Sequence, residues 1–82
     1  MKESLVLLRT KEVIARRARG RSSHYNDISE GLFPPPISVG IRAVATPEHE
    51  VNAIISAQIA GKTREEIKEL VRKIAADRAN IA

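Results

Sequence analysis

Apolar residues recur at helical spacing most clearly in the C-terminal part of the chain. Four residues, three or four positions apart, form one stripe: Ile67, Leu70, Val71 and Ile74. Thr63 precedes them and Glu66 follows it by three positions, a capping box that typically starts a helix. We therefore expect an amphipathic helix over residues 63–78. Its apolar face either folds back on the preceding helix or pairs with a second copy of the chain.

The segment before it also has the pattern of a helix. Thr46, Pro47 and Glu48 combine a capping hydroxyl, a proline suited to the first helical position and an acid near the positive end of the helix dipole. A mostly apolar stripe follows and ends before Gly61: Val51, Ile54, Ile55, Gln58 and Ile59. The pattern predicts two consecutive amphipathic helices with a short turn between them.

Apolar positions are sparser in the first half of the chain. Leu5 to Leu8 could form a short strand or an arm that lies on the core. Residues 11–18 are expected to form the first helix, with Thr10 as its cap. Val13 and Ile14 should be buried there, and the stem of Arg17 should pack while its charged head reaches water.

A short polar helix is predicted over residues 21–30. Tyr25, Ile28 and Leu32 have the spacing of one inward-facing stripe. The opposite side is polar and should face solvent or a partner, with Ser22, Ser23, Asn26 and Glu30. Gly31 can close a helix in the left-handed conformation, and the three prolines at 34–36 cannot extend one.

A β-hairpin is predicted over residues 37–45. Residues 37–39 and 42–45 can pair, with Gly40 and Ile41 at the tip supplying the positive backbone dihedral that such turns require. The order of helix, turn at Arg19 and Gly20, helix and hairpin predicts a mainly α fold with a small β-hairpin. This is a winged helix-turn-helix plus a C-terminal amphipathic helix. We expect a winged helix-turn-helix domain over residues 1–61, with the added helix in 62–82.

Positive charge is concentrated in the N-terminal half. Residues 1–45 carry eight basic and four acidic side chains, whereas residues 46–82 carry six of each. Six cations lie within residues 9–21, against Glu12 alone: Arg9, Lys11, Arg16, Arg17, Arg19 and Arg21. A charge run is by itself equally typical of a solvated face. Here, however, it covers the first helix and the turn, which cross the sugar-phosphate backbone in a helix-turn-helix. Double-stranded DNA is therefore the expected partner, bound with a steep salt dependence.

The residues for sequence discrimination are expected on the second helix and at the hairpin. Asn26 suits adenine and Arg21 suits guanine. Ser22 and Ser23 can bond a phosphate through hydroxyl and backbone N–H groups at the helix start. Arg42 lies just past the hairpin tip, where it could reach a phosphate or the minor groove. Together with Arg16, Arg17 and Arg19, these residues form the predicted DNA-binding set.

The remaining residues argue against an enzyme. Ser22, Ser23 and His24 point in different directions on a helix, and no acid is placed to orient the histidine. His24 and His49 lie without metal-ligand spacing, so both are expected at the surface. The chain has no cysteine and no Gly-x-Gly phosphate loop. We expect no cofactor, no metal and no small-molecule substrate.

The longest apolar run, Leu5 to Leu8, is far shorter than the roughly 20 residues of a membrane span. It is also too short for the apolar region of a signal peptide. No membrane association is therefore expected, and the protein should be cytoplasmic.

Several motifs, in fixed order, resemble the AlpA family of small phage- and prophage-type transcriptional regulators. The likeness runs from about Leu8 to Ile59, and its blocks are Thr10-Lys11-Glu12-Val13, Arg21-Ser22-Ser23-His24-Tyr25, Glu30-Gly31-Leu32-Phe33-Pro34-Pro35-Pro36 and Gly40-Ile41-Arg42-Ala43-Val44-Ala45. The resemblance implies a MerR-like, excisionase-like winged helix-turn-helix that binds DNA and controls prophage or mobile-element genes. By position it implies that Arg21, Ser22 and Ser23 open the recognition helix, that Tyr25 packs inside and that Arg42 lies on the wing.

The chain departs from the family pattern at a few positions. Ala18-Arg19-Gly20 stands where Gly-Leu-Ser is usual, and Asp27 stands where a leucine is usual. Thr46 and Ile54 occupy positions where tryptophan is usual, which should leave a thinner core. The helix after Thr63 lies outside the family domain. It keeps open an alternative function, a recombinase-accessory or antitoxin-like adaptor that docks through this helix, and a possible homodimer through residues 63–78.

Overall fold

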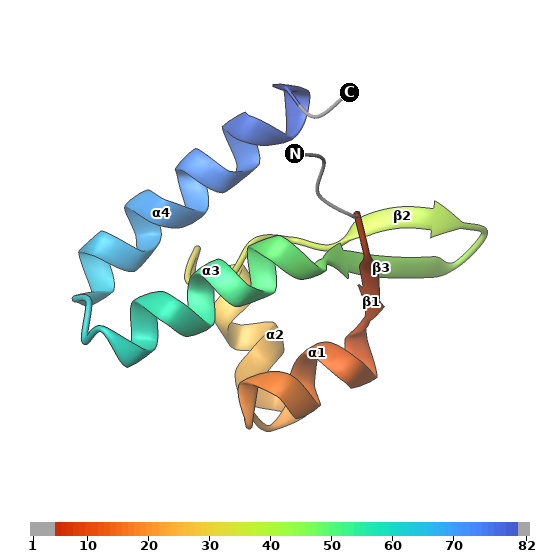
Figure 1. The fold of residues 1–82 in the computed structure, drawn as a ribbon. Helices are drawn as coiled ribbons and strands as arrows, with labels where there is room; N and C mark the ends of the chain where they lie inside the picture. The colour runs from red at the N-terminus through yellow and green to blue at the C-terminus, as the bar shows by residue number, and fades with distance from the viewer. Residues whose placement is uncertain (1–4, 81–82) are drawn as a thin grey trace.

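The computed structural model describes residues 5–80, and its described part is mainly helical with a small antiparallel sheet (Figure 1). The elements follow in the order β1 (Leu7–Arg9), α1 (Thr10–Arg17), α2 (Arg21–Ser29), β2 (Ile37–Gly40), β3 (Ala43–Pro47), α3 (Glu48–Ile59), α4 (Arg64–Asp77) and the 3-10 helix η1 (Arg78–Asn80). This order fits a small helix-turn-helix domain. Within residues 5–80, the helices are too short and too polar to cross a membrane.

The sheet contains one strand more than the predicted hairpin. β2 and β3 pair antiparallel, and β1 pairs with the other edge of β3, so that the strand order is β1-β3-β2. Leu8 lies opposite Thr46 and both are buried. The Leu5 to Leu8 segment, which could have been a strand or an arm, thus contributes a strand. Thr46, expected as a helix cap, belongs to β3 instead, and α3 follows directly at Glu48.

The hairpin tip differs from the sequence prediction in one detail. The residue with a positive φ is Arg42, at 61°, and not Gly40. Gly40 pairs with Ala43, which leaves Ile41 and Arg42 as the loop, and the register is irregular between Ser38 and Gly40. Ile41 is 95% exposed. A non-glycine residue in the left-handed region is uncommon, so the tip is held by its neighbours in the hairpin.

The core lies between the helices and one face of the sheet. Its buried apolar residues are Leu8, Val13, Phe33, Val51, Ile54, Val71 and Ile74. Two of these, Val71 and Ile74, come from α4, and Ile67 and Leu70 pack against the same cluster. The predicted amphipathic helix is therefore confirmed, and its stripe packs inside the chain. The Thr63 hydroxyl accepts from the backbone N–H of Glu66, which completes the expected capping box.

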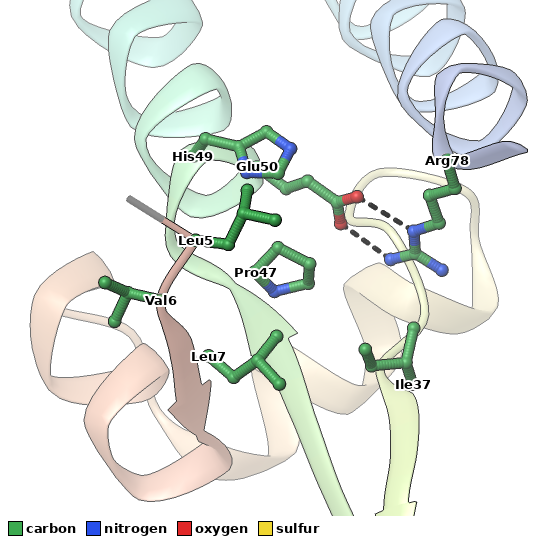
Figure 2. A pocket seen from close by; sticks show the side chains of 8 residues that line it. All are labelled: Leu5, Val6, Leu7, Ile37, Pro47, His49, Glu50 and Arg78. Carbon is green, nitrogen blue, oxygen red and sulfur yellow. Dashed lines mark hydrogen bonds and ion pairs between the residues drawn. The ribbon is translucent and has the colours of Figure 1, made fainter. Parts of the chain in front are cut away.

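A buried ion pair attaches the end of α4 to the rest of the molecule. Glu50, in the first turn of α3, is fully buried, and Arg78 meets it with two hydrogen bonds (Figure 2). Arg78 Nε lies 2.8 Å from Glu50 Oε2, and Nη2 lies 2.6 Å from Oε1. Nη2 also donates to the carbonyl oxygen of Pro35, at 2.7 Å. One arginine thus connects α3, the proline segment and the C-terminal turn, and the carboxylate raises its pKa.

Candidate nucleic-acid interface

Helix α2 follows α1 after a tight turn of three residues, Ala18 to Gly20. Ala18 adopts the left-handed conformation with φ 53°, and its backbone N–H closes α1 against the Ala15 and Ile14 carbonyls. The expected turn at Arg19 and Gly20 is therefore completed by Ala18. Gly20 precedes α2 without a side-chain cap, and the first hydrogen bond along the helix is from His24 N to Gly20 O. The N–H groups of Arg21 to Ser23 therefore stay available for a partner.

The face of α2 that turns away from the core carries most of the predicted contact residues. Arg21, Ser22, Ser23 and Asn26 are all exposed. Tyr25 is exposed as well, which corrects the expectation that it packs inside. The buried side of α2 is formed instead by His24 and Asp27, with Ile28 partly buried against the core. The expected surface position of His24 was therefore wrong, because its ring lies against Arg17 and Phe33 on the buried side of α2.

Two arginines converge on the carboxylate of Asp27 on the buried side of α2. Arg19 donates to it from Nε at 2.8 Å and from Nη2 at 2.9 Å, and Arg17 Nη2 donates at 3.1 Å. Arg17 also donates to His24 Nδ1 at 2.9 Å, and its guanidinium lies 4.3 Å from the centre of the Phe33 ring. This Asp27 cluster joins α1, the turn and α2 into one unit.

The Arg17 side chain is only 1% exposed. The expectation that its head reaches water is therefore wrong, because the residue that stands in place of the usual leucine, Asp27, draws the guanidinium inside. Arg17 Nε is buried without a hydrogen-bond partner in the described structure. Such a buried cation is stable only while its counter-ion is charged. Arg17 therefore positions α2, and its guanidinium is too deeply buried to contact a phosphate.

The Asp27 cluster shifts the ionisation of its members in a consistent way. Hydrogen bonds, first from Arg19 and then from Arg17, hold the pKa of Asp27 below its usual value. Burial, followed by the charge of Arg17, lowers the pKa of His24. His24 is therefore neutral near pH 7 and accepts at Nδ1, so that its proton lies on Nε2. The net result is one carboxylate shared between two guanidinium groups, with a neutral imidazole beside them.

The other arginines of the predicted DNA-binding set differ in whether a carboxylate already neutralises their charge. Arg16 is bound by two carboxylates, since Nε lies 3.1 Å from Glu12 and Nη1 lies 2.7 Å from Glu48. Arg19 is partly exposed although it is paired with Asp27. Arg21 and Arg42 are exposed and form no ion pair within residues 5–80. Part of the positive charge counted in the sequence is therefore neutralised internally. The unpaired arginines of the predicted DNA-binding set lie at the start of α2 and at the hairpin tip.

The far end of α2 meets α4, a contact that sequence reasoning missed. Asn26 Nδ2 donates to Glu30 at 3.3 Å, and Glu30 forms an ion pair with Arg64 at the start of α4. The hydrogen bond and the charge of Arg64 hold the pKa of Glu30 below its usual value, with smaller contributions from Asn26 and then Lys68. The signal was hard to find because Glu30 and Arg64 are 34 positions apart and no helical period connects them. The hydrogen bond between Asn26 and Glu30 is long and exposed.

Within the described residues, His, Cys, Asp and Glu side chains form no group of three that could hold a metal ion. Helix α2 has exposed polar donors on one side and the buried Asp27 cluster on the other.

Comparison with known proteins gives two findings. The family described as prophage CP4-57 regulatory protein (AlpA) matches residues 6–59. An uncharacterised protein of Enterobacteria phage P4, ORF88, is 40% identical over 57 residues, which cover 70% of this chain and 65% of that protein. The chain thus spans just under two thirds of the length of this relative. No solved structure matches.

Proposed function

This chain belongs to the family of the prophage CP4-57 regulatory protein AlpA, and from this premise we propose that it is a sequence-specific DNA-binding transcriptional regulator of prophage or mobile-element genes. In this proposal the structure acts as a winged helix-turn-helix. Helix α2 enters the major groove, and the β2–β3 hairpin is the wing that lies on the backbone or in the minor groove.

The observation that carries the proposal is the division of α2 into two sides. One side is fixed to α1 by buried His24 and Asp27. The other side presents Arg21, Ser22 and Asn26 to solvent. A helix that reads base edges needs this combination, because its orientation must be set before contact and its polar side must stay free.

We assign different tasks to the individual residues. Arg21 and Asn26 would read base edges, and Ser22 and Ser23 would bind a phosphate together with the free N–H groups at the helix start. Arg42, and with it the exposed parts of Arg16 and Arg19, would contact the sugar-phosphate backbone. Arg17 belongs to the DNA-binding set only indirectly, because it holds α2 in place. Residues 1–61 would carry all contacts with DNA, and residues 62–82 would complete the core.

The direct test compares Arg21→Ala with wild type on two DNA duplexes. One duplex comes from the neighbourhood of the protein's own gene and the other is a random sequence, and binding is measured by fluorescence anisotropy. We expect Arg21→Ala to weaken binding to the cognate duplex by about 1–3 kcal/mol and to affect random DNA much less. Arg72→Ala is the matched control, since Arg72 is an exposed arginine of α4 paired only with Glu69. Equal, salt-insensitive binding of all variants to both duplexes would exclude the proposal.

The wing is tested by Arg42→Gly. Glycine tolerates the positive φ of this position, so the substitution removes the cation and keeps the turn. We expect weaker binding to both duplexes and a salt dependence that is smaller by about one released ion. An unchanged salt slope would remove Arg42 from the interface.

The adaptor function has less support from the structure. It was based on an unpartnered apolar stripe on the last helix, and the stripe residues Val71 and Ile74 are buried in the core of the chain.

A further inference from the structure

Tyr25 is the only tyrosine of the chain, and it lies in the middle of the exposed side of α2. It follows Arg21 by four positions and Ser22 by three, so these side chains are neighbours on one helix face. The exposed residues of this face have the spacing of a single stripe: Arg21, Ser22, Tyr25, Asn26 and Ser29. Tyr25 itself is 49% exposed. The side of α2 that we propose reads base edges therefore presents an aromatic ring among polar side chains.

Two further rings support the ring of Tyr25 on its core side. Tyr25 meets the imidazole of His24 edge to face, with 5.6 Å between the ring centroids and 64° between the ring planes. His24 is only 2% exposed and meets the ring of Phe33 in the same way, at 4.9 Å and 61°. Edge-to-face arrangements of this kind are favourable. A row of three rings thus leads from the core to the surface and restricts the positions that the outer ring can adopt.

The apolar surface of this ring needs an apolar partner on the DNA. A half-exposed tyrosine is ordinary on a protein surface, but in the proposed complex α2 lies in the major groove and the ring loses its contact with water. Removing an apolar ring from water is favourable, whereas a polar group that loses water against it is left without a hydrogen bond. Base edges present one apolar group in the major groove, the C5-methyl group of thymine, beside their donors and acceptors.

We propose that the ring of Tyr25 packs on the methyl group of a thymine, next to the bases that Arg21 and Asn26 read. This inference rests on the proposed function and adds a specificity-determining residue to it. Tyr25 recognises an apolar group, whereas Arg21 and Asn26 recognise polar ones. Because His24 already holds the ring, the contact requires little further ordering of the side chain.

The contact is tested by removing each of its two partners separately. Deoxyuridine pairs like thymidine but lacks the methyl group, so thymines of the cognate duplex are replaced by deoxyuridine one at a time, and binding is measured by fluorescence anisotropy. We expect wild type to bind about fourfold more weakly when the contacted thymine is replaced, the effect of one buried methyl group. Tyr25→Ala should bind the thymine duplex at least fourfold more weakly than wild type and should lose nothing further at that position.

Two control variants separate the ring from other effects. Tyr25→Phe keeps the ring and removes the hydroxyl group, so it should retain the fourfold effect of the methyl group. Ile59→Ala changes an apolar residue that is 82% exposed at the end of α3, and it should also retain the effect. Circular dichroism verifies that each variant is folded. The inference is overturned if Tyr25→Ala responds to deoxyuridine as wild type does. A loss of affinity in Tyr25→Phe as large as in Tyr25→Ala also overturns it, because the contact would then belong to the hydroxyl group.

The inference and the proposed function can fail separately. If Arg21→Ala abolishes the preference for the cognate duplex while the deoxyuridine effect is the same with and without the Tyr25 ring, the thymine contact is wrong and the proposed function stands. A wild type without any preference for the cognate duplex overturns both.

Discussion

Asp27 and Glu50 are both buried carboxylates paired with arginine, yet they belong to different parts of the molecule. Asp27 lies in the basic half and is shared by two arginines of the positively charged run. Glu50 lies in the neutral half and meets a single arginine from the C-terminal turn. The first pairing fixes the proposed recognition helix on α1. The second fixes the segment after α4 on α3. The same chemistry therefore orients a binding surface in one place and completes the fold in the other.

This difference also explains why the charge of the sequence overstates the charge of the surface. Arg17 counts toward the basic run but is buried with its counter-ion. Arg78 counts toward the neutral half, but its guanidinium is paired with the buried Glu50 and is only partly exposed. It therefore adds little positive charge to the surface. Net charge by region was enough to predict a class of partner, while the distribution of charge over the individual arginines required coordinates.

The largest effect is expected at Asp27. Asp27→Ala leaves Arg17 buried without its counter-ion, which costs about 3–5 kcal/mol in comparable cases. A domain of this size has little more stability than that, so the variant should be largely unfolded at 37 °C. Urea denaturation measures the loss, and Asp77→Ala, at an exposed aspartate of α4, is the control.

A double variant makes the test at Asp27 sharper. Asp27→Leu combined with Arg17→Met replaces both buried charges by apolar side chains, and it should recover most of the stability that Asp27→Leu alone loses. If the single and the double variant were equally unstable, the Asp27 cluster would matter for its shape and not for its charge.

A slightly smaller effect is expected at Arg78. Arg78→Ala leaves Glu50 fully buried and unpaired, with an expected loss of about 3 kcal/mol. Glu50→Ala should cost less, because the partly exposed Arg78 can turn toward water. Arg72→Ala, an exposed pair, should change stability by about 0.5 kcal/mol or less. A loss in Glu50→Ala that exceeds the loss in Arg78→Ala would contradict this reasoning.

The smallest effect concerns the pH dependence of stability, to which His24 and Asp27 of the Asp27 cluster contribute. The pKa of His24 is lowered in the folded state, so below its ordinary value of 6.5 the unfolded chain binds a proton that the folded chain does not. Stability should therefore fall as the pH drops below 6.5, by up to about 1.4 kcal/mol per unit. The lowered pKa of Asp27 adds a further loss only at much lower pH, as its carboxylate is protonated. His24→Gln should flatten the slope just below pH 6.5, as followed by thermal melts.

Most of the fold could be predicted because it follows from local patterns. The capping box at Thr63 and the stripe from Ile67 to Ile74 defined α4 within one residue. The hairpin was visible as two apolar runs around a glycine. The resemblance to the AlpA family, which rested on motif order, is confirmed by the match over residues 6–59.

The inner side of α2 could not be predicted in the same way. A period of three and four selected Tyr25, but the helix buries His24 and Asp27 because two arginines from α1 and the turn satisfy the carboxylate. Hydrophobic periodicity has no means of recognising a polar residue that is buried by its partners. The pairings of Glu50 with Arg78 and of Glu30 with Arg64 were missed for a related reason, since they join segments far apart in the chain.

The pairing of Glu50 with Arg78 has a consequence for synthesis on the ribosome. Glu50 is translated 28 residues before its counter-ion. A chain that closed its interior before Arg78 is available would enclose an unpaired carboxylate, which is costly. The compact form should therefore become favourable only when the segment after α4 can dock on α3.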